Sequence, residues 1–348
     1  MAKILYAAAG DGYGHATRVH SVGAGLLERG HDVLFLTSHK TKAYLSPRFP
    51  GRVQEVLGLL TAYCDGRVQP WKTLTNNAKE AWRSLVASIH SVRHLFKEFG
   101  PDLVISDFEP FAPFWALRLG VPFISLDNQH LLTHAELEFP RGFVFDRWTA
   151  YATIRLFYTG ARRYLITSFI PARIRHQPAA VVPPVLRAEV HEKQSHEGGF
   201  LLAYKGAGGE NQSLRAALEQ CEEVPIRAYG FGEAGRRDHI EFKAFDANVF
   251  LDDLAGCVGV VATAGHSLVS ECIQLEKPML LVPIRRQYEQ IINAHYVRKL
   301  GFGEFADRLS RRAIQSLLVR LDNYRRALRA APKVRLSTVL DAVEREIP

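Results

Sequence analysis

KILYAAAGDGYGHATRVHSVGAGLLERGHDVLFLTS, residues 3–38, holds two apolar runs on either side of one amphipathic segment. The runs KILYAAA (3–9) and HDVLFLTS (31–38) have the length and composition of buried strands, and RVHSVGAGLLERG (18–30) has the spacing of an amphipathic helix. A strand, a helix and a second strand in this order form a βαβ unit, which requires a parallel sheet. The stretch therefore predicts an α/β fold.

The same alternation continues along the chain. The apolar runs PDLVISD (101–107) and VPFISLD (121–127) flank the helical segment EPFAPFWALRLG (109–120). A second series begins after a polar, glycine-tipped stretch. Its predicted strands are FLLAYKG (200–206), IRAYGF (226–231), GVVATAG (259–265) and MLLVPI (279–284).

The length of the chain sets the number of domains. With 348 residues, 47% hydrophobic and 23% charged, it suits two globular domains. We expect a first domain at 1–187, a linker at 188–198, a second domain at 199–325 and a helical segment at 326–348. Doubly wound, Rossmann-like domains bind ligands at the carboxyl ends of their strands, so we expect the site in the cleft between the two domains.

The net charge of +8 is concentrated in the middle of the chain. Residues 141–187 contain eight arginines and one acidic residue, Asp146, among aromatic residues such as Trp148 and Phe157. This composition is typical of a surface that docks on anionic lipid headgroups, although core aromatics and solvated arginines produce it too. No known nucleic-acid-binding module accompanies the charge, so nucleic acid is not an expected partner.

Several features bear on the compartment. No apolar run approaches the roughly 18 to 20 residues of a membrane-spanning helix, and the N-terminus lacks a secretory pattern. Cys64, Cys221, Cys257 and Cys272 lie far apart without a CxxC pair, which predicts neither a disulfide framework nor a zinc site. We expect a cytoplasmic protein, peripheral on the inner membrane face if the arginine-rich segment contacts lipid.

An anion site is predicted in VGVVATAGHSLVSECIQLEKPMLLVPIRRQYEQIINA, residues 258–294. A strand ends at Ala262, the chain turns through Gly265, and a helix begins near His266. The free N–H groups and the dipole of such a helix start attract anions, so a pyrophosphate would fit there. Glu271 follows after one to two turns and could accept both hydroxyls of a ribose. The alternative is a capped helix with a surface glutamate.

The spacing G-x-x-x-x-x-E followed by KPMLLVPIRRQYEQIINA resembles the donor signature of GT-B nucleotide-sugar glycosyltransferases. The likeness is to UDP-dependent natural-product enzymes and to the lipid-linked GlcNAc transferase of peptidoglycan synthesis. Thr263 departs from the histidine that opens the signature in plant-type enzymes. The positions implied by the resemblance are Gly265, His266 and Ser267 for the diphosphate, Glu271 for the ribose, and Glu289 with Gln290 for the sugar hydroxyls.

Two weaker donor contacts follow from the same resemblance. The turn YKGAGG (204–209) lies near the phosphates in that family, so Lys205 could neutralise charge there, although an exposed lysine has the same sequence signal. The stretch EFKAFDANVFLDDLAGC (241–257) resembles the region that brackets the base, with Phe245 as the expected contact.

The loop GDGYGHATR (10–18) resembles the glycine-rich loop that these enzymes carry after their first strand. Since the diphosphate is assigned to the second domain, we expect this loop to serve the acceptor. Gly12 and Gly14 would let the backbone approach the acceptor closely, with Arg18 as a further acceptor contact. His15 is the expected general base, because a neutral imidazole can take a hydroxyl proton near neutral pH. A loop histidine bonded to backbone is the alternative.

A general base needs a group that orients it. Asp107 ends the predicted strand LVISD, where the parallel-sheet rule points toward the cleft. The resembled plant-type enzymes pair a histidine with an aspartate at similar separation. Glu109 and Asp127 remain alternatives.

The resemblance thus implies an inverting, metal-independent glycosyltransferase that uses a nucleotide diphosphate sugar, with UDP as the default. The first domain would bind the acceptor, for which a lipid or polyprenyl-linked molecule is the expectation. The second would bind the donor, and residues 326–348 would pack back on the first. No cofactor and no metal ion are expected. A nucleotide-sugar hydrolase of the pseudaminic-acid pathway type is the alternative enzyme, and a non-catalytic sugar-nucleotide- or lipid-binding subunit is the alternative outside enzymes.

Overall fold

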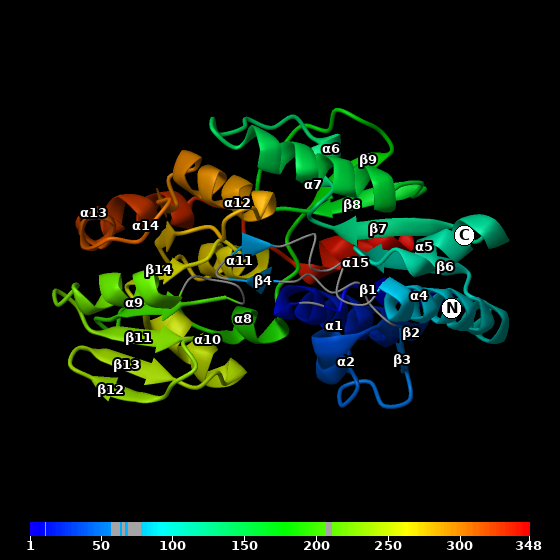
Figure 1. The fold of residues 1–348 in the computed structure, drawn as a ribbon, viewed down its shortest axis with the longest axis horizontal. Coiled ribbons are helices and arrows are strands. Elements are labelled where there is room, and N and C mark those ends of the chain that lie inside the picture. The colour runs from blue at the N-terminus through cyan, green and yellow to red at the C-terminus, as the bar shows by residue number, and fades with distance from the viewer. Residues whose placement is uncertain (11, 57–62, 65–66, 69–77, 207–210) are drawn as a thin grey trace.

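The computed structural model describes residues 1–10, 12–56, 63–64, 67–68, 78–206 and 211–348. Within them the chain forms two seven-stranded sheets that lie side by side (Figure 1). The first sheet has the order β3-β2-β1-β6-β7-β8-β9 and is parallel throughout. Its strands are β1 (Lys3–Ala8), β2 (Asp32–Thr37), β3 (Val53–Glu55), β6 (Leu103–Asp107), β7 (Phe123–Asp127), β8 (Arg163–Thr167) and β9 (Ala179–Val182). We call the chain from β1 to β9 the first lobe.

The second sheet has the order β12-β13-β11-β10-β14-β15-β16 and is parallel except for β12, which pairs antiparallel with β13. We call the chain from β10 to β16 and on through α14 the second lobe. Its strands are β10 (Leu201–Tyr204), β11 (Ile226–Tyr229), β12 (Gly235–Arg237), β13 (Ile240–Lys243), β14 (Gly259–Ala262), β15 (Met279–Leu281) and β16 (Gly303–Phe305). A separate antiparallel pair joins β4 (Tyr63–Cys64) and β5 (Arg67–Val68).

Helices cover both faces of each sheet (Figure 1). Those of the first lobe are α1 (Tyr13–Glu28), α2 (His39–Leu45), α4 (Ala78–Phe99), α5 (Phe111–Leu119), α6 (Leu131–His134) and α7 (Val144–Phe157). Those that follow are α8 (Ala188–Glu192), α9 (Asn211–Glu219), α10 (Ala247–Gly256), α11 (His266–Gln274), α12 (Tyr288–Lys299), α13 (Arg311–Val319), α14 (Leu321–Arg329) and α15 (Leu336–Glu344). The predicted α/β fold with two doubly wound sheets is confirmed.

The strands are apolar because both of their faces are covered. In β1, Ile4 and Tyr6 pack into one core cluster, and Leu5 and Ala7 pack into a second cluster on the other face. All four side chains are fully buried. This two-sided burial is what parallel sheets with helices on both faces require, and it explains the continuous apolar runs in the sequence.

The first helix begins earlier than the sequence predicted. We expected a loop through residue 17, but α1 starts at Tyr13, so His15 lies in its first turn. Gly12 supplies the N-cap with a φ of 97°, a left-handed conformation that glycine adopts without strain. The apolar periodicity starts only at Val19, which is why the pattern did not reveal the first turn.

The C-terminal helix α15 lies on the first lobe, although only residues 330–335 separate it in the chain from α14 of the second lobe (Figure 1). Val339, Leu340 and Val343 belong to the same core cluster as β1 and α1. At its exposed side Arg29 donates to Asp341 (2.8 Å) and to Glu344. The chain therefore crosses between the lobes twice, once at residues 183–187 and again at residues 330–335. Residues 188–192 of the predicted linker form α8.

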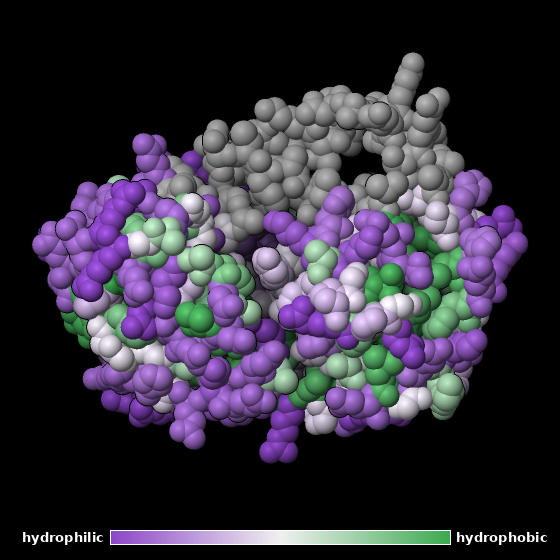
Figure 2. Space-filling model, turned by 90° about the horizontal axis from the view of Figure 1, so that it is seen from below, coloured by the Kyte–Doolittle hydropathy of each residue, from purple (hydrophilic) through white to green (hydrophobic). Residues whose placement is uncertain are grey.

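On the face seen from below, hydrophilic residues predominate and hydrophobic residues form smaller patches between them (Figure 2). In the described part of the chain, no helix combines the length and the apolar character that crossing a bilayer demands.

Candidate active site

The first lobe brings together two residues that lie 92 positions apart. The strand order of its sheet reverses between β1 and β6, so the chain leaves these two neighbouring strands in opposite directions. The loops that follow the two strands separate at such a switch point and leave a crevice. His15 comes from the segment after β1, and Asp107 is the last residue of β6. His15 Nδ1 lies 2.9 Å from Asp107 Oδ1. If Asp107 accepts the Nδ1 proton, Nε2 keeps its lone pair for a substrate proton.

Arg18 also binds Asp107, from the next turn of α1. Its Nε donates to Oδ2 (2.7 Å) and its Nη2 to Oδ1 (2.6 Å). Burial raises the pKa of Asp107, but Arg18 and His15 together hold it below its ordinary value, so the carboxylate is charged. The sequence suggested Arg18 as an acceptor contact; in the structure its side chain is buried and its guanidinium is directed at Asp107.

The two alternative partners of His15 are engaged elsewhere. Glu109 accepts hydrogen bonds from the backbone N–H groups of Phe111 (2.9 Å) and Ala112 (2.8 Å), and so caps α5. Asp127 accepts from the backbone N–H of His130 (2.9 Å) and contacts His130 Nδ1 (2.7 Å). Asp107 is therefore the carboxylate that the structure places beside His15.

Glu109 makes the stability of the first lobe depend on pH. Burial raises the pKa of Glu109 from 4.5 to about 7, although two backbone N–H groups oppose the rise. The folded state thus holds this proton more tightly than the unfolded state, and its contribution is complete below pH 4.5 and is lost as the pH rises through about 7. As the pH rises from 4.5 to above 7, we expect the free energy of unfolding of Glu109→Gln to increase relative to that of wild type by on the order of 3 kcal/mol.

Urea unfolding of both proteins at several pH values measures this difference. A stability difference between Glu109→Gln and wild type that stays constant with pH would contradict the assignment.

The second lobe repeats the switch-point arrangement. Its sheet reverses between β10 and β14, and the segments after these strands meet: a Cβ on Gly206 would lie 2.7 Å from Thr263 Oγ1. Helix α11 begins here, with Gly265 as an N-cap that has no side chain to satisfy the first N–H groups. No acidic residue lies in the first turn. These N–H groups are therefore open to an anion.

The first turns of α1 and α11 face each other across the lobes. Gly14 packs so closely on α11 that a Cβ at this position would lie 2.7 Å from Ser267 Oγ. Helix α1 also lacks a side-chain cap and has no acid in its first turn. Two helix N-termini without side-chain caps thus lie next to each other, so both contribute partial positive charge to the same region.

Glu271 is held by a residue that the sequence did not single out. Arg187 Nε donates to Oε1 (2.8 Å) and Nη2 to Oε2 (2.9 Å). The side chains of Arg187 and Glu271 are 10% and 6% exposed, so Glu271 is not a surface residue. Burial raises the pKa of Glu271, and the contact with Arg187 opposes this rise. Nothing in the local spacing indicates that Arg187 and Glu271 pair, since they lie 84 positions apart.

The residues expected at the sugar lie near the start of α12. Gln290 accepts from the backbone N–H of Ile284 (3.1 Å) and donates to Gln287 (2.5 Å), so its amide already holds the loop before the helix. Glu289 and His266 line a small pocket between the lobes. Its other lining residues are Asn128, Leu131, Leu132 and Ser168 from the first lobe and Ile292 and Asn293 from the second.

His266 is neutral in this pocket. Burial lowers its pKa to about 3, and Arg18 contributes to the shift. Its Nε2 is buried and has no hydrogen-bond partner among the described residues. The sequence predicted that the backbone N–H of His266 contacts the diphosphate at the helix start. Its ring lines the interlobe pocket, near Phe169.

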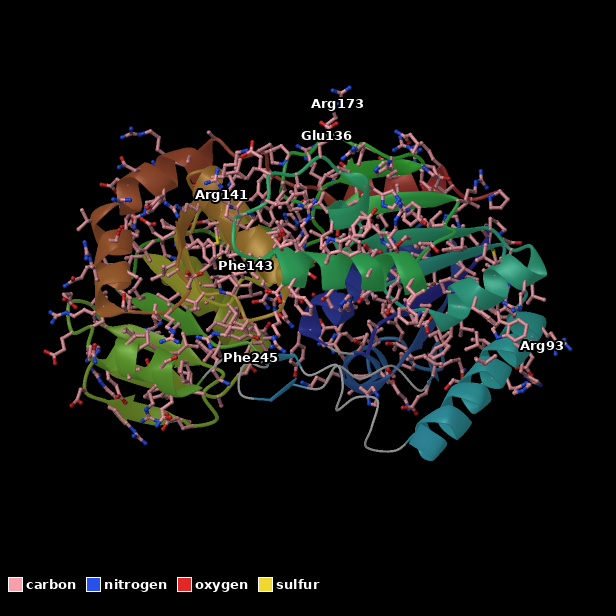
Figure 3. The ribbon with its side chains drawn as sticks, turned by 45° about the horizontal axis from the view of Figure 1, so that its top comes forward. Arg93, Glu136, Arg141, Phe143, Arg173 and Phe245 are labelled. Carbon is pink, nitrogen blue, oxygen red and sulfur yellow. The ribbon has the colours of Figure 1, made fainter. Side chains whose placement is uncertain are left out.

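The last two predicted donor residues lie at the rim of the second lobe. Lys205 follows β10 and is half-buried, and Phe245 is 44% exposed. Phe245 stacks on Tyr13 of the first lobe, with ring centroids 5.7 Å apart, and lies on the side of the second lobe that faces the first (Figure 3). Residues 207–209 of the YKGAGG turn and Asp11 of the first loop lie outside the described residues.

The sequence and the fold were compared with those of known proteins. Among curated proteins none matches the sequence. Solved structures share the fold: UGT2 of Phytolacca americana, complexed with UDP-2-fluoro-glucose and pterostilbene, is 15% identical, with a TM-score of 0.69 over 95% of this chain and 93% of that one. MurG of Acinetobacter baumannii is 15% identical, with a TM-score of 0.63 over 99% and 100%. The glycosyltransferase VinC, in complex with dTDP, is 14% identical, with a TM-score of 0.64 over 99% of each chain.

These structures confirm the predicted GT-B fold. The sequence also matches the profile of glycosyl transferase family 1 over residues 2–322. Since that profile spans nearly the whole chain, the protein is a glycosyltransferase and belongs to glycosyl transferase family 1.

Proposed function

We propose that this glycosyltransferase moves a sugar from a nucleoside diphosphate donor, with UDP as the first candidate, to an acceptor hydroxyl with inversion and without a metal ion. The observation that carries the proposal is the position of the His15–Asp107 pair opposite the uncapped start of α11. A base and an anion site that face each other are what a displacement at a sugar carbon needs. In this proposal residues 1–187 bind the acceptor and residues 199–325 bind the donor.

His15 Nε2 takes the proton of the acceptor hydroxyl as its oxygen attacks the anomeric carbon. The bond from that carbon to the diphosphate oxygen breaks, and its electron pair leaves with the nucleoside diphosphate from the opposite face. Asp107 holds the ring and stabilises the imidazolium that forms. Attack from the face opposite the leaving group inverts the configuration.

The leaving diphosphate gains negative charge as the bond breaks. The N–H groups of His266 and Ser267 at the start of α11 would receive this charge, and those of α1 add to the field. Gly265 would let the diphosphate approach the turn closely, since its own N–H donates to the Thr263 carbonyl (3.0 Å). One such preorganised donor contributes about 3 to 4 kcal/mol to lowering the barrier in other enzymes. Lys205 would add a positive charge beside the same diphosphate.

The rest of the donor would extend along the second lobe. Glu271 would accept the ribose hydroxyls, Glu289 and Gln290 would bind the sugar, and Phe245 would contact the base. UGT2 binds a UDP sugar and VinC binds dTDP, which supports a nucleoside diphosphate donor and leaves the base to be determined by experiment.

A thermal-shift screen of the purified protein with UDP, dTDP and GDP tests the donor half. A ligand that binds only the folded state at 100 times its Kd stabilises that state by about 2.7 kcal/mol, so we expect UDP to raise the Tm. If none of the three nucleotides raises the Tm, the proposal is wrong. Complete release of free sugar from a UDP-sugar without any acceptor would identify a hydrolase instead.

Helix α7 supports a lipid-linked acceptor at an anionic membrane. Only Ile154 of this helix is buried, whereas its exposed apolar side chains include Phe145 (77%) and Trp148 (68%). Arg141 and Phe143 lie on the loop that leads into α7 and passes beside α12 (Figure 3). Exposed aromatic side chains flanked by arginines fit a surface of anionic headgroups.

We expect the protein to co-sediment with vesicles that contain anionic lipid and to bind neutral vesicles much more weakly, with binding that falls as salt increases. The double variant Phe145→Ser/Trp148→Ser should weaken binding at least about tenfold, because each side chain loses at least about 1.5 kcal/mol of apolar burial in the interface. Val319→Ser, which removes a still more exposed apolar side chain (86%) from the second lobe, serves as the control. Equal binding of the double variant and wild type would refute this surface.

A further inference from the structure

The short connector at residues 183–187 is anchored in both lobes. Val185 packs in the core cluster of the first lobe, and the next residue, Leu186, packs in a core cluster of the second. Pro183 and Pro184 restrict the backbone before them. Arg187 follows directly, so its backbone is fixed at the point where the chain passes from one lobe to the other.

From this point Arg187 reaches the second turn of α11. Its Nε and Nη2 donate to Oε1 and Oε2 of Glu271 at 2.8 Å and 2.9 Å, so the guanidinium binds the carboxylate in a bidentate fork. Such a bidentate pair fixes the plane of the carboxylate as well as its distance. A buried pair of this kind costs desolvation and contributes little to stability by itself, so stability alone does not account for it.

The fork leaves the carboxylate able to bind a further ligand. Each carboxylate oxygen has two lone pairs, and Arg187 uses one on each. The remaining lone pair on each oxygen can accept one hydroxyl. Two hydroxyls on adjacent carbons, as in a ribose, match two oxygens held in one plane.

We infer that Arg187 is a positioning residue that orients the Glu271 carboxylate for the ribose of the donor and ties it to the connector between the lobes. The inference rests on the proposed function, since it assigns Glu271 to the nucleoside. It adds that the ribose site is completed by a residue outside the sheet and helices of the second lobe.

The effect of Arg187 on the pKa of Glu271 can be measured as a pH dependence of ligand binding. Among the described residues, the other titratable groups around the pair are Glu189 on α8, Tyr44 on α2, Tyr204 on β10 and Cys272 on α11. Burial raises the pKa of Glu271, Arg187 lowers it and Glu189 raises it. Without Arg187 the pKa of Glu271 rises further, so the carboxylate takes up a proton at higher pH and loses acceptors for the ribose.

The test compares UDP binding by wild type, Arg187→Met and Arg187→Lys in calorimetric titrations. We expect Arg187→Met to bind UDP at least about tenfold more weakly at a pH near 6, and to recover part of the loss toward a pH near 8.5. Arg187→Lys should lie between it and wild type, because a lysine keeps the charge but not the fork. Arg173→Met is the matched control, since Arg173 is exposed and projects away from the molecule (Figure 3).

Titration with inorganic pyrophosphate is a second measurement, which reports on the diphosphate site alone because pyrophosphate lacks a ribose. Its affinity should be the same in wild type and Arg187→Met, which also shows that the variant folds. In the background of Glu271→Gln, the change Arg187→Met should have no further effect on UDP affinity.

Two results overturn the inference while leaving the proposed function in place. The first is that Arg187→Met binds UDP with the same affinity and the same pH dependence as wild type. The other is tighter UDP binding by that variant, which would make Arg187 a competitor of the ribose. A wild-type protein that binds none of UDP, dTDP and GDP would remove the proposed function, and the inference with it.

Discussion

Replacement of His15 by alanine is expected to lower kcat by about 10²- to 10⁴-fold, the usual contribution of a positioned general base. The Kd for UDP should change by less than about threefold, because the proposed mechanism has the imidazole act on the acceptor and the diphosphate bind at α11. His15 is only partly buried, at 16% side-chain exposure, so its removal creates a small void at most. Initial rates of UDP release and calorimetric UDP titrations measure the two quantities.

His94→Ala is the control, because it removes a histidine from a helix far from the proposed reaction. His94 lies on α4 with 71% of its side chain exposed. It should turn over like wild type. Turnover of the His15 variant within a factor of a few of wild type would remove His15 from the mechanism. A parallel loss of UDP binding would move His15 to the donor side.

Glu271→Leu is expected to have two large effects at once. It leaves the buried Arg187 without its carboxylate partner. Removing one partner of a buried ion pair lowers the free energy of unfolding by about 3 to 5 kcal/mol. It also removes the proposed acceptor of the ribose hydroxyls, so UDP should no longer raise the Tm. Denaturant unfolding and thermal shift with UDP measure these effects separately.

The double variant Glu271→Leu/Arg187→Leu separates stability from binding. Because a buried ion pair can be replaced by apolar residues at little cost, we expect its free energy of unfolding to return close to that of wild type. UDP binding should stay lost. If UDP raises the Tm of the stable double variant as much as that of wild type, Glu271 does not hold the nucleoside.

The sequence predicted those parts of the site that depend on local patterns and on one rule of sheet topology. The run before Gly265 showed a buried strand, and glycine followed by a helical pattern showed where α11 begins. The pairing of His15 with Asp107 was predicted from the rule that ligands gather at the carboxyl ends of parallel strands and from the resemblance to plant-type enzymes, with two other carboxylates left as alternatives. The structure supplied the distance and the reason, which is the strand reversal between β1 and β6.

Side-chain partners that lie far apart in the sequence could not be predicted in this way. Arg187 looks like one more arginine of a basic segment until the connector brings it to Glu271. Arg18 follows His15 in a glycine-rich motif and so suggested a ligand contact, but the turn of α1 directs it to Asp107. In both cases a buried carboxylate determines where the guanidinium lies, and burial is a property of the tertiary fold.

The two crossings between the lobes restrict how this molecule can open. A body attached to another by two short tethers can swing about the line through the tethers, but it cannot slide along its partner or spin freely against it. Here the tethers are residues 183–187 and 330–335, and α15 fastens the second of them to the first lobe through Leu340 and Val343. Substrate entry would then require one swinging motion that separates Gly14 from Ser267, and a covalent clamp between those two positions should lock the molecule shut.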